Sequence, residues 1–407
     1  MTKSQVNKLG KELRAKIRSN ENPTLELLEK LQDYRTSFKN DISAVFENIS
    51  DIAKNARKDS ITSFRIKRIE SILSKIKRQP TMSLGNMGDI AGCRILVYSE
   101  DSLKKVINNL KLKFNVIGYN DYLSENKDDG YRGYHIYIES PINKYKTIEI
   151  QIRTVKSHKW ASMVEIIDIV YNLKIKEGEK HPDFQKFHLL LSNSDKLTLS
   201  QQKEVIKIDD KYNVHNKLNE VFITNHLKIR KDWLGISPNK NPFFIIEVDE
   251  NKTSNISSFK SYEIAEKEYF KKFKISTNSN FVLTHIEKPN FKRLCIAYAS
   301  YVLIKHDYLL DWNRYTNDIL DELIEQKDYD QIKYFKEYTQ RNLQEQLRLL
   351  ENELAEISEY REENVNDFEG YDEWMAEIGD RVKEVTRIAI ERTKDKKKKN
   401  IWEKVFG

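Results

Sequence analysis

Before Pro80, apolar residues recur every three or four positions, as in ENPTLELLEKLQDYRTSFKNDISAVFENIS. This spacing predicts amphipathic helices. In the segment ITSFRIKRIESILSKIKRQ it places Ile66, Ile69, Leu73 and Ile76 on one helical face, and Pro80 ends the segment. The first 79 residues are therefore predicted to be helical.

After this block the pattern changes to short apolar runs and strict alternation. The runs DIAGCRILVYS, GYRGYHIYIES and TIEIQIRT predict strands. The segments DSLKKVINNLKLKF and KSHKWASMVEIIDIVYNLKI have helical spacing. The mixture predicts an α/β fold, a mixed β-sheet flanked by helices, complete by about residue 195.

A polar segment, SNSDKLTLSQQ, separates this region from a second one. Beyond it, NPFFIIEVDENKTSNISSF predicts a hairpin, SYEIAEKEYFKKF a helix and NFVLTHIE a strand. From about residue 293 the spacing is again helical. We therefore expect three parts: residues 1–195, a small α/β domain at 203–292, and a helical C-terminal region at 293–407.

The composition is that of a soluble globular protein, with 33% charged and 39% apolar residues in 407. No run approaches the roughly 18 apolar residues of a membrane helix, and the first residues, MTKSQVNKLGKELRAK, contain no apolar signal segment. Cys93 and Cys295 each lie in an apolar segment. Two such cysteines argue against a disulfide framework or a cysteine zinc site and favour the reducing cytoplasm.

The net charge of +7 is unevenly distributed. Residues 1–80 contain 18 Lys/Arg and 10 Asp/Glu, whereas residues 351–380 contain 12 acidic residues and one arginine. A basic block suits phosphate-bearing ligands such as nucleotides or RNA. A solvated helical surface explains the same charges and stays an alternative.

Basic and hydroxyl groups share one stripe of the helix predicted before Pro80. Lys67, Ser71 and Lys75 are spaced i, i+4, i+8, and Arg65 and Arg68 flank them. Two ammonium groups and a hydroxyl on one ridge suit a polyphosphate, and an arginine can stack on a base or bind a phosphate through two hydrogen bonds. An amphipathic helix with a basic solvent face is the alternative.

Two carboxylates occur in or beside apolar strands. Asp89 opens DIAGCRILVY, and Glu149 lies within TIEIQIRT. A carboxylate in such a place is costly unless it is paired or binds a cation. Two of them on neighbouring strands are typical of a Mg²⁺ site that water and phosphate oxygens complete. A salt bridge to Arg94 or Arg153, or a solvent-facing strand side, would also explain them.

The stretch DDGYRGYHIYIE places a tight bend before a strand. Its two glycines, Gly130 and Gly133, permit sharp backbone turns. A tyrosine here could stack on a base, and cations or an imidazole could meet phosphate or a sugar hydroxyl. A hairpin whose tyrosines pack on the core is the alternative. The candidate ligand groups around the bend are Lys127, Tyr131, Arg132 and His135.

In this order, the three features resemble the synthetase domain of the RelA/SpoT family, the (p)ppGpp pyrophosphokinases. The matching segments are RIKRIESILSK, DIAGCRI, NDYLSENKDDGYRGYH and IEIQIRTVKSHKWAS. The resemblance covers about residues 40–195. It implies transfer of the β,γ-pyrophosphate of ATP to the 3′-hydroxyl of GDP or GTP, with Mg²⁺ as cofactor.

The resemblance also implies roles for individual residues. The ATP-binding residues would be Arg65, Lys67, Ser71, Lys75 and Arg94. The catalytic and metal-binding residues would be Asp89 and Glu149. The acceptor-binding residues would be Lys127, Tyr131, Arg132, His135, Gln151 and Arg153.

One departure from the family opens an alternative. Asn120 stands where long family enzymes carry a basic residue, which puts binding of the acceptor's 5′-phosphates in doubt. Some toxic relatives pyrophosphorylate the 3′ end of tRNA, and the C-terminal half here could restrain such a domain or respond to a regulatory protein, such as a phage protein. A degenerate domain that only senses nucleotide or RNA is a third hypothesis, and a homo-oligomer is left open. No histidine precedes His135, so we do not expect the family's His-Asp hydrolase domain.

Overall fold

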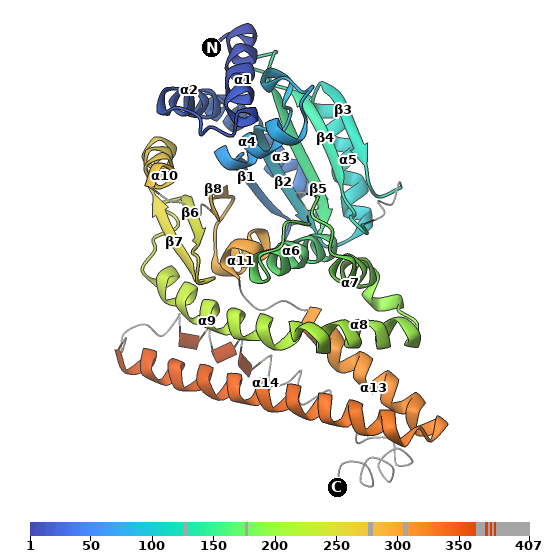
Figure 1. The fold of residues 1–407 in the computed structure, drawn as a ribbon. Helices are drawn as coiled ribbons and strands as arrows, with labels where there is room; N and C mark the ends of the chain where they lie inside the picture. Colours follow the sequence, from blue (N-terminus) through green and yellow to red (C-terminus); the bar gives the residue numbers. More distant parts are fainter. Residues whose placement is uncertain are drawn as a thin grey trace. The chain divides into compact units, whose positions relative to one another are not determined.

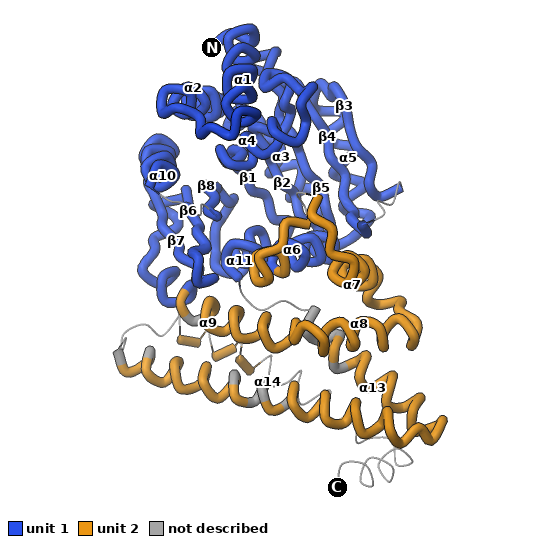
Figure 2. Tube along the Cα trace, in the orientation of Figure 1, with its two compact units in different colours: residues 1–166, 229–303 blue, residues 167–228, 304–407 orange. Residues whose placement is uncertain are grey.

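The computed structural model describes residues 1–124, 129–175, 178–275, 280–303, 308–363, 371–372, 375–376 and 378–379 (Figure 1). Contacts divide the chain into two compact units (Figure 2). Unit 1 consists of Met1–Ile166 and Ile229–Leu303, and unit 2 of Ile167–Lys228 and Ile304–Gly407. This division differs from the three predicted parts, because residues 229–303 join the first unit.

Unit 1 contains one mixed sheet of eight strands in the order β3-β4-β5-β2-β1-β8-β6-β7. β2 and β5 are parallel, and the other paired strands are antiparallel. The predicted mixed sheet flanked by helices is thus confirmed. The strands are β1 Ile61–Ile66, β2 Ala91–Val97, β3 Val116–Asp121, β4 Tyr134–Glu139, β5 Thr147–Thr154, β6 Phe243–Val248, β7 Ser254–Phe259 and β8 Asn280–Ile286.

The expected small α/β domain adds its strands to this sheet. The predicted hairpin forms β6 and β7, and the next predicted strand, β8, pairs with both β6 and β1. Ser63 lies opposite Ile286, and Arg65 opposite Thr284. The Thr284 hydroxyl also donates a hydrogen bond to the Phe64 carbonyl at 3.0 Å. β8 therefore covers an edge of β1 that would otherwise present unpaired backbone groups.

The continuous helix predicted before Pro80 is wrong in its first part. Residues Ile61–Ile66 form β1, and helix α4 begins only at Ile69 and ends at Arg78. The sequence ITSF is rich in β-branched and aromatic residues, and β1 pairs with a strand on each side. Arg65 therefore lies on a strand and Lys67 on the connection, while Ser71 and Lys75 are on α4.

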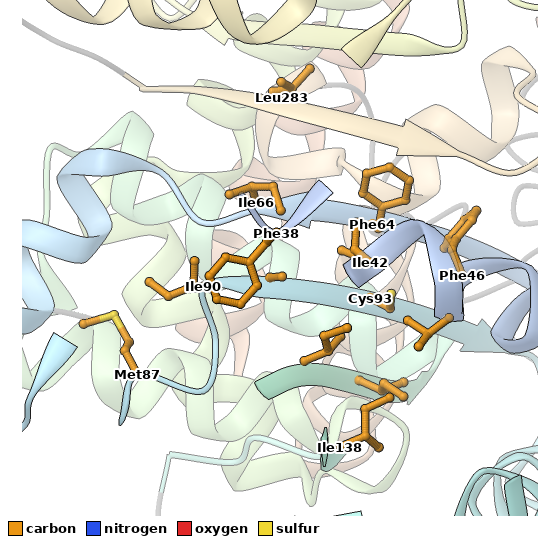
Figure 3. Close-up of a cluster of buried hydrophobic side chains, with 14 of the residues drawn as sticks. Phe38, Ile42, Phe46, Phe64, Ile66, Met87, Ile90, Cys93, Ile138 and Leu283 are labelled. Atoms are coloured by element: carbon orange, nitrogen blue, oxygen red, sulfur yellow. The ribbon is translucent and has the colours of Figure 1, made fainter. Parts of the chain in front are cut away.

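Alternation along the strands separates a core face from a polar face. On β5, Ile148, Ile150 and Ile152 are fully buried, and Glu149 and Gln151 occupy the intervening positions. Helices α3 (Lys39–Ala56) and α5 (Glu100–Lys113) cover the core face. Figure 3 shows side chains of this core from α3 and from strands distant in sequence.

The other helices of unit 1 are α1 Lys3–Arg18, α2 Leu25–Thr36, α6 Val155–Val170, α10 Tyr262–Ile275, α11 Phe291–Ala297 and α12 Ala299–Val302. α6 continues into unit 2, and α9 crosses back into unit 1. The helices of unit 2 are α7 Pro182–Ser192, α8 Leu199–Tyr212, α9 Val214–Leu234, α13 Tyr308–Gln326 and α14 Tyr329–Glu363. The helical C-terminal region is confirmed over its described residues. Among the helices that the structure describes, none has the length and apolar character needed to cross a membrane.

Candidate active site

The strand register gathers the predicted site residues on the polar face of the sheet in unit 1. The first row contains Tyr137, Glu149, Gly92 and Arg65, and the second contains His135, Gln151 and Arg94. Residues two apart on a strand face the same side, so both rows project from one surface. Gly92, which lies between Glu149 and Arg65 in the first row, has no side chain, and a Cβ there would lie 3.9 Å from Glu149 Oε2.

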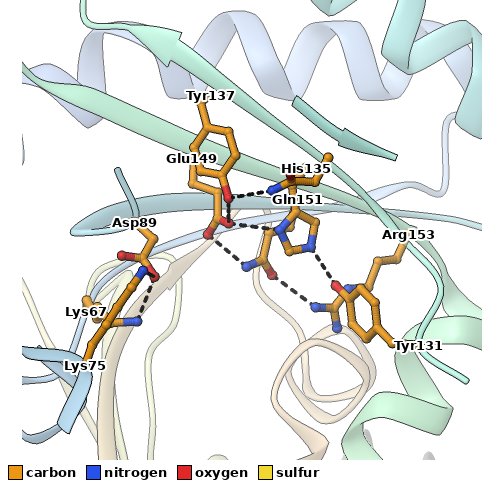
Figure 4. Close-up of polar contacts among 10 residues, drawn as sticks. Lys67, Lys75, Asp89, Tyr131, His135, Tyr137, Glu149, Gln151 and Arg153 are labelled. Carbon is orange, nitrogen blue, oxygen red and sulfur yellow. Dashed lines mark hydrogen bonds and ion pairs between the residues drawn. The ribbon is translucent and has the colours of Figure 1, made fainter. Parts of the chain in front are cut away.

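Asp89 and two lysines form the charged end of this surface. Lys67 Nζ and Lys75 Nζ each donate to Asp89 Oδ2 at 2.9 Å (Figure 4). Their side chains are only 19% and 21% exposed, so these lysines are not part of a solvent-facing stripe. Burial alone would raise the pKa of Asp89, but the two ammonium groups hold it below its ordinary value. Asp89 is therefore a carboxylate at neutral pH.

The two acidic residues fit a magnesium ion. Asp89 and Glu149 line the same pocket. Among the described residues, Asp89 Oδ1 is a buried oxygen without a hydrogen-bond partner, as a metal ligand would be before the metal binds. In the described ranges no group of three or more His, Cys, Asp or Glu side chains converges. Mg²⁺ commonly needs only one or two carboxylates besides water and phosphate oxygens.

Glu149 is the centre of a hydrogen-bonded network. Its Oε1 accepts from His135 Nδ1 at 2.9 Å and from the Tyr137 hydroxyl at 3.2 Å, and its Oε2 accepts from Gln151 Nε2 at 2.9 Å (Figure 4). Burial opposes ionisation, but His135 and, next, the hydrogen bond from Gln151 hold the pKa of Glu149 below its ordinary value. Donation from Nδ1 leaves His135 Nε2 to accept a hydrogen bond from the Tyr131 hydroxyl at 2.6 Å.

The bend before β4 fixes Tyr131 on the polar face. Gly130 has a φ of 86°, in the left-handed region that favours glycine. A Cβ on Gly133 would lie 3.1 Å from the Tyr131 hydroxyl oxygen and 3.2 Å from Arg153 Cγ. The Arg153 guanidinium carbon lies 4.7 Å from the centre of the Tyr131 ring. Tyr134, in contrast, is only 4% exposed and belongs to the hydrophobic core, so the core-packing alternative holds for that tyrosine alone.

Two predicted site residues, Ser71 and Arg132, lie apart from these contacts, and a third cannot be placed. Ser71 is half-buried on α4, one turn before Lys75, and does not line the pocket. Arg132 is exposed. Lys127 lies outside the described residues.

Residues 297–301, which the sequence analysis did not connect with the site, contact it at Arg94. The half-buried Arg94 side chain donates from Nη1 to the Ala297 carbonyl at 2.7 Å. Its guanidinium carbon is 5.6 Å from the centre of the Tyr298 ring, and that of Arg68 is 5.8 Å from the Tyr301 ring. Burial, and next the charge of Arg65, lower the pKa of Arg94 to about 10. Tyr298 lines the pocket, whose volume is only about 30 Å³.

Helix α6 and β8 hold this segment in place. His158 Nε2 lies 3.0 Å from the Ile296 carbonyl, and the Ser300 hydroxyl donates to Glu165 at 2.5 Å. The Thr284 hydroxyl oxygen, whose proton is donated to the Phe64 carbonyl, is also hydrogen-bonded to the hydroxyl of Tyr298. His158 belongs to the segment IEIQIRTVKSHKWAS, which the family resemblance had already singled out. The sequence IAYASYVL around Tyr298 resembles an ordinary apolar helix and gave none.

Comparisons with known proteins agree with the resemblance. Residues 64–176 match the family described as "Region found in RelA / SpoT proteins". The chain is 34% identical over 125 residues to the GTP pyrophosphokinase YjbM of Bacillus subtilis, covering 28% of this chain and 59% of that protein. It is 35% identical over 114 residues to the GTP pyrophosphokinase YwaC of the same organism, covering 25% and 54%. The chain thus spans somewhat more than half the length of these relatives, and the predicted resemblance to the family is confirmed for residues 64–176.

Solved structures with a similar backbone include the small alarmone synthetase 1 of Bacillus subtilis bound to its product pppGpp. That protein is 21% identical, with a TM-score of 0.36, and the match covers 46% of this chain and 97% of the other. A likeness with so low a TM-score carries no argument about function.

Proposed function

We propose that this chain, whose residues 64–176 match the region found in RelA/SpoT proteins, is an ATP-dependent pyrophosphokinase that makes (p)ppGpp. The observation that carries the proposal is the convergence of Asp89, Glu149 and Lys67 on one pocket of the polar sheet face. The 3′-oxygen of GDP or GTP would bond to the β-phosphorus of ATP as the bridge to the α-phosphate breaks. AMP and the hydroxyl proton would be released.

The donor side supplies positive charge where phosphates would bind. Lys67 and Lys75 meet at Asp89, and Arg65 and Arg94 line the same pocket wall from β1 and β2. Fixed cations stabilise negative charge as it moves between phosphate oxygens, and they cost no reorganisation during the reaction. Mg²⁺ held by Asp89 and Glu149 would supply further charge neutralisation on the phosphates.

The acceptor side supplies a stacking surface and an oriented carboxylate. Tyr131, backed by Arg153, would stack on the acceptor base. Glu149 is fixed by His135, Tyr137 and Gln151, so it can accept a hydrogen bond from the 3′-hydroxyl in one orientation.

A second candidate is a toxic enzyme that modifies the tRNA 3′ end and is restrained by its own C-terminal half. Two observations favour it. Asn120 donates its amide to Tyr137 at 3.2 Å and leaves this part of the acceptor side without the family's cation. Tyr298 and Tyr301 lie against the donor-side arginines Arg94 and Arg68. In this proposal α11 and α12 compete with ATP for these arginines, and a regulatory protein that moves the two helices would activate the enzyme.

One experiment tests both candidates. The full chain and the variant Tyr298→Ala/Tyr301→Ala are incubated with γ-labelled ATP, Mg²⁺ and either GDP/GTP or bulk tRNA. Label in guanosine tetra- or pentaphosphate supports the first acceptor, and label on tRNA supports the second. Failure of both proteins to label either acceptor would overturn the enzyme proposal.

The same experiment tests the restraint. The double variant should transfer at least about tenfold more label than the unchanged chain, the effect of relieving roughly 1.4 kcal/mol of competition. Equal activity would contradict the restraint while leaving the reaction itself intact. Asp89→Ala in the double variant is the control, and it should remove the added activity.

A further inference from the structure

A buried polar network joins α2 and α10 to the backbone that precedes the donor helix α4. Arg35 on α2 is fully buried, and its Nε donates to the Lys67 carbonyl at 2.7 Å. Its Nη1 lies 3.4 Å from Glu266 Oε2, and it also donates to the Gln32 side-chain oxygen. Gln32 Nε2 in turn donates to Glu266 at 2.9 Å. A carboxylate from α10 thus orients the arginine that holds the Lys67 main chain.

Tyr269, one turn after Glu266 on α10, makes the second contact. The first N–H groups of a helix lack intrahelical partners. The one at Ile69, the first residue of α4, donates to the Tyr269 hydroxyl at 3.2 Å. The Tyr269 ring lies under the Arg35 guanidinium, with 4.4 Å from the guanidinium carbon to the ring centre. Tyr269 therefore caps the donor helix from 200 residues away.

A third contact comes from β8. Arg68 donates from Nη1 to the side-chain oxygen of Asn280 at 2.8 Å, and Arg65 pairs with Thr284 along the strands. The main chain is thus held by β8 at Arg65, by α2 at the Lys67 carbonyl and by α10 at the Ile69 N–H, and β8 also binds the Arg68 side chain. These contacts come from α2, α10 and β8, whereas Tyr298 and Tyr301 lie at α11 and α12.

We propose that Arg35 and Tyr269 are positioning residues of the donor site, which fix the backbone of Lys67–Ile69 and with it the Lys67 ammonium group. The inference rests on the proposed binding of ATP. It divides the part of unit 1 that follows α9 into elements with opposite effects. α10 and β8 support the donor site, and residues 297–301 cover it.

The burial of the network is what distinguishes support from ordinary packing. A buried arginine is expensive to desolvate, and apolar residues of similar volume would often give equal or greater stability. Arg35 instead donates a hydrogen bond to the carbonyl of Lys67, the residue whose ammonium group binds Asp89. A positional error of about 1 Å in such a group can cost on the order of 100-fold in rate.

The test uses Tyr269→Phe, which keeps the ring over Arg35 and removes the acceptor of the Ile69 N–H. The matched control is Tyr315→Phe in unit 2, which removes a fully buried hydroxyl that donates to the Ser194 carbonyl at 2.9 Å. Both variants are made in the full chain carrying Tyr298→Ala. Affinity for α,β-methylene-ATP is measured by calorimetry, together with Tm and amide hydrogen exchange at α4.

We expect Tyr269→Phe to weaken binding of the analogue about three- to tenfold and to speed exchange at the start of α4, since a buried N–H loses its partner. Tyr315→Phe should lower Tm without changing that affinity. If Tyr269→Phe lowers Tm as the control does and binds the analogue as the parent does, the positioning role is overturned. If the parent itself shows no saturable binding, the proposed function fails and this inference fails with it.

Discussion

The two sides of the candidate site are built in different ways. The acceptor side comes from one continuous stretch, residues 116–154, in which β3, β4 and β5 are neighbours. The donor side is assembled from β1, α4 and β2, and is then held by α10 and covered by Tyr298. Its supports are about 200 residues away in sequence.

This difference suggests that the donor side can be regulated by distant segments, whereas the acceptor side is fixed by its own residues. In the acceptor network, hydrogen bonds join the Tyr131 side chain to His135 and His135 to Glu149, so its members hold one another in place. If the proposal is right, the donor side depends on α10, β8 and Tyr298, so a change in these elements would alter ATP binding and leave the acceptor network unchanged. Four substitutions test this division.

Asp89→Asn should have the largest effect. A carboxamide keeps the volume but cannot neutralise Lys67 and Lys75 or bind Mg²⁺, so we expect transfer of label from γ-labelled ATP to fall about 10²–10³-fold. Asp121→Asn, which alters a half-buried carboxylate on β3, is the control for a lost charge elsewhere on the sheet. If Asp89→Asn kept more than about a tenth of the parent's activity, the assignment of Asp89 to the ATP-binding side would be wrong.

Tyr131→Ala should act on the acceptor side alone. Loss of a stacked ring is expected to raise the acceptor KM about 10–100-fold, as stacking is worth about 1–3 kcal/mol per base. Affinity for α,β-methylene-ATP should be unchanged. Tyr131→Phe, which keeps the ring, should remain near the parent. Equal weakening of both substrates by the alanine variant would show that the two sides are not separable.

Asn120→Lys tests why the acceptor side lacks a cation. We expect kcat/KM with GDP or GTP to rise about two- to fivefold relative to tRNA labelling, because a partly exposed charge contributes up to about 1 kcal/mol. Asn120→Gln adds length without charge and should give no such rise. A similar change in both variants would mean that the hydrogen bond to Tyr137, and not the charge, is responsible.

Gly133→Ala should have the smallest effect. The new methyl group would lie 3.1–3.2 Å from Tyr131 and Arg153, so these side chains must shift by a few tenths of an ångström. We expect a two- to threefold rise in acceptor KM, about 0.5 kcal/mol, with ATP affinity unaltered. Gly118→Ala, whose Cβ would be 4.0 Å from Tyr137, is the matched control. No difference between the two variants would argue against close packing at Tyr131.

Much of the acceptor side could be predicted from local pattern. Strict alternation in TIEIQIRT places Glu149 and Gln151 on one face of a strand, and the family resemblance grouped His135 with Gln151. The strand register brings the three residues together. The Gly130 turn was also readable, because few residues other than glycine adopt its φ. Tyr137 was overlooked, although the same alternation places it beside His135.

The donor side was less predictable, because its structure depends on distant pairing. Arg65 and Lys67 were assigned to a helix, and the strand that contradicts this assignment is stabilised in part by β8. Tyr298 and Tyr301 gave no signal, since tyrosines in an apolar helix usually belong to the core. Their contacts with Arg94 and Arg68 exist only once the chain has folded back.

The pairing of β8 with β1 also sets an order of events during translation. About 210 residues lie between the two strands, which is about 10–40 s of synthesis at ~5–20 residues per second. Tyr298 leaves the ribosome only about 0.6–2.4 s after the end of β8 at the same speed. A nascent chain therefore spends almost no time with a supported donor site that is still uncovered. A ribosome that stalls before β8 releases a chain with neither the support nor the cover.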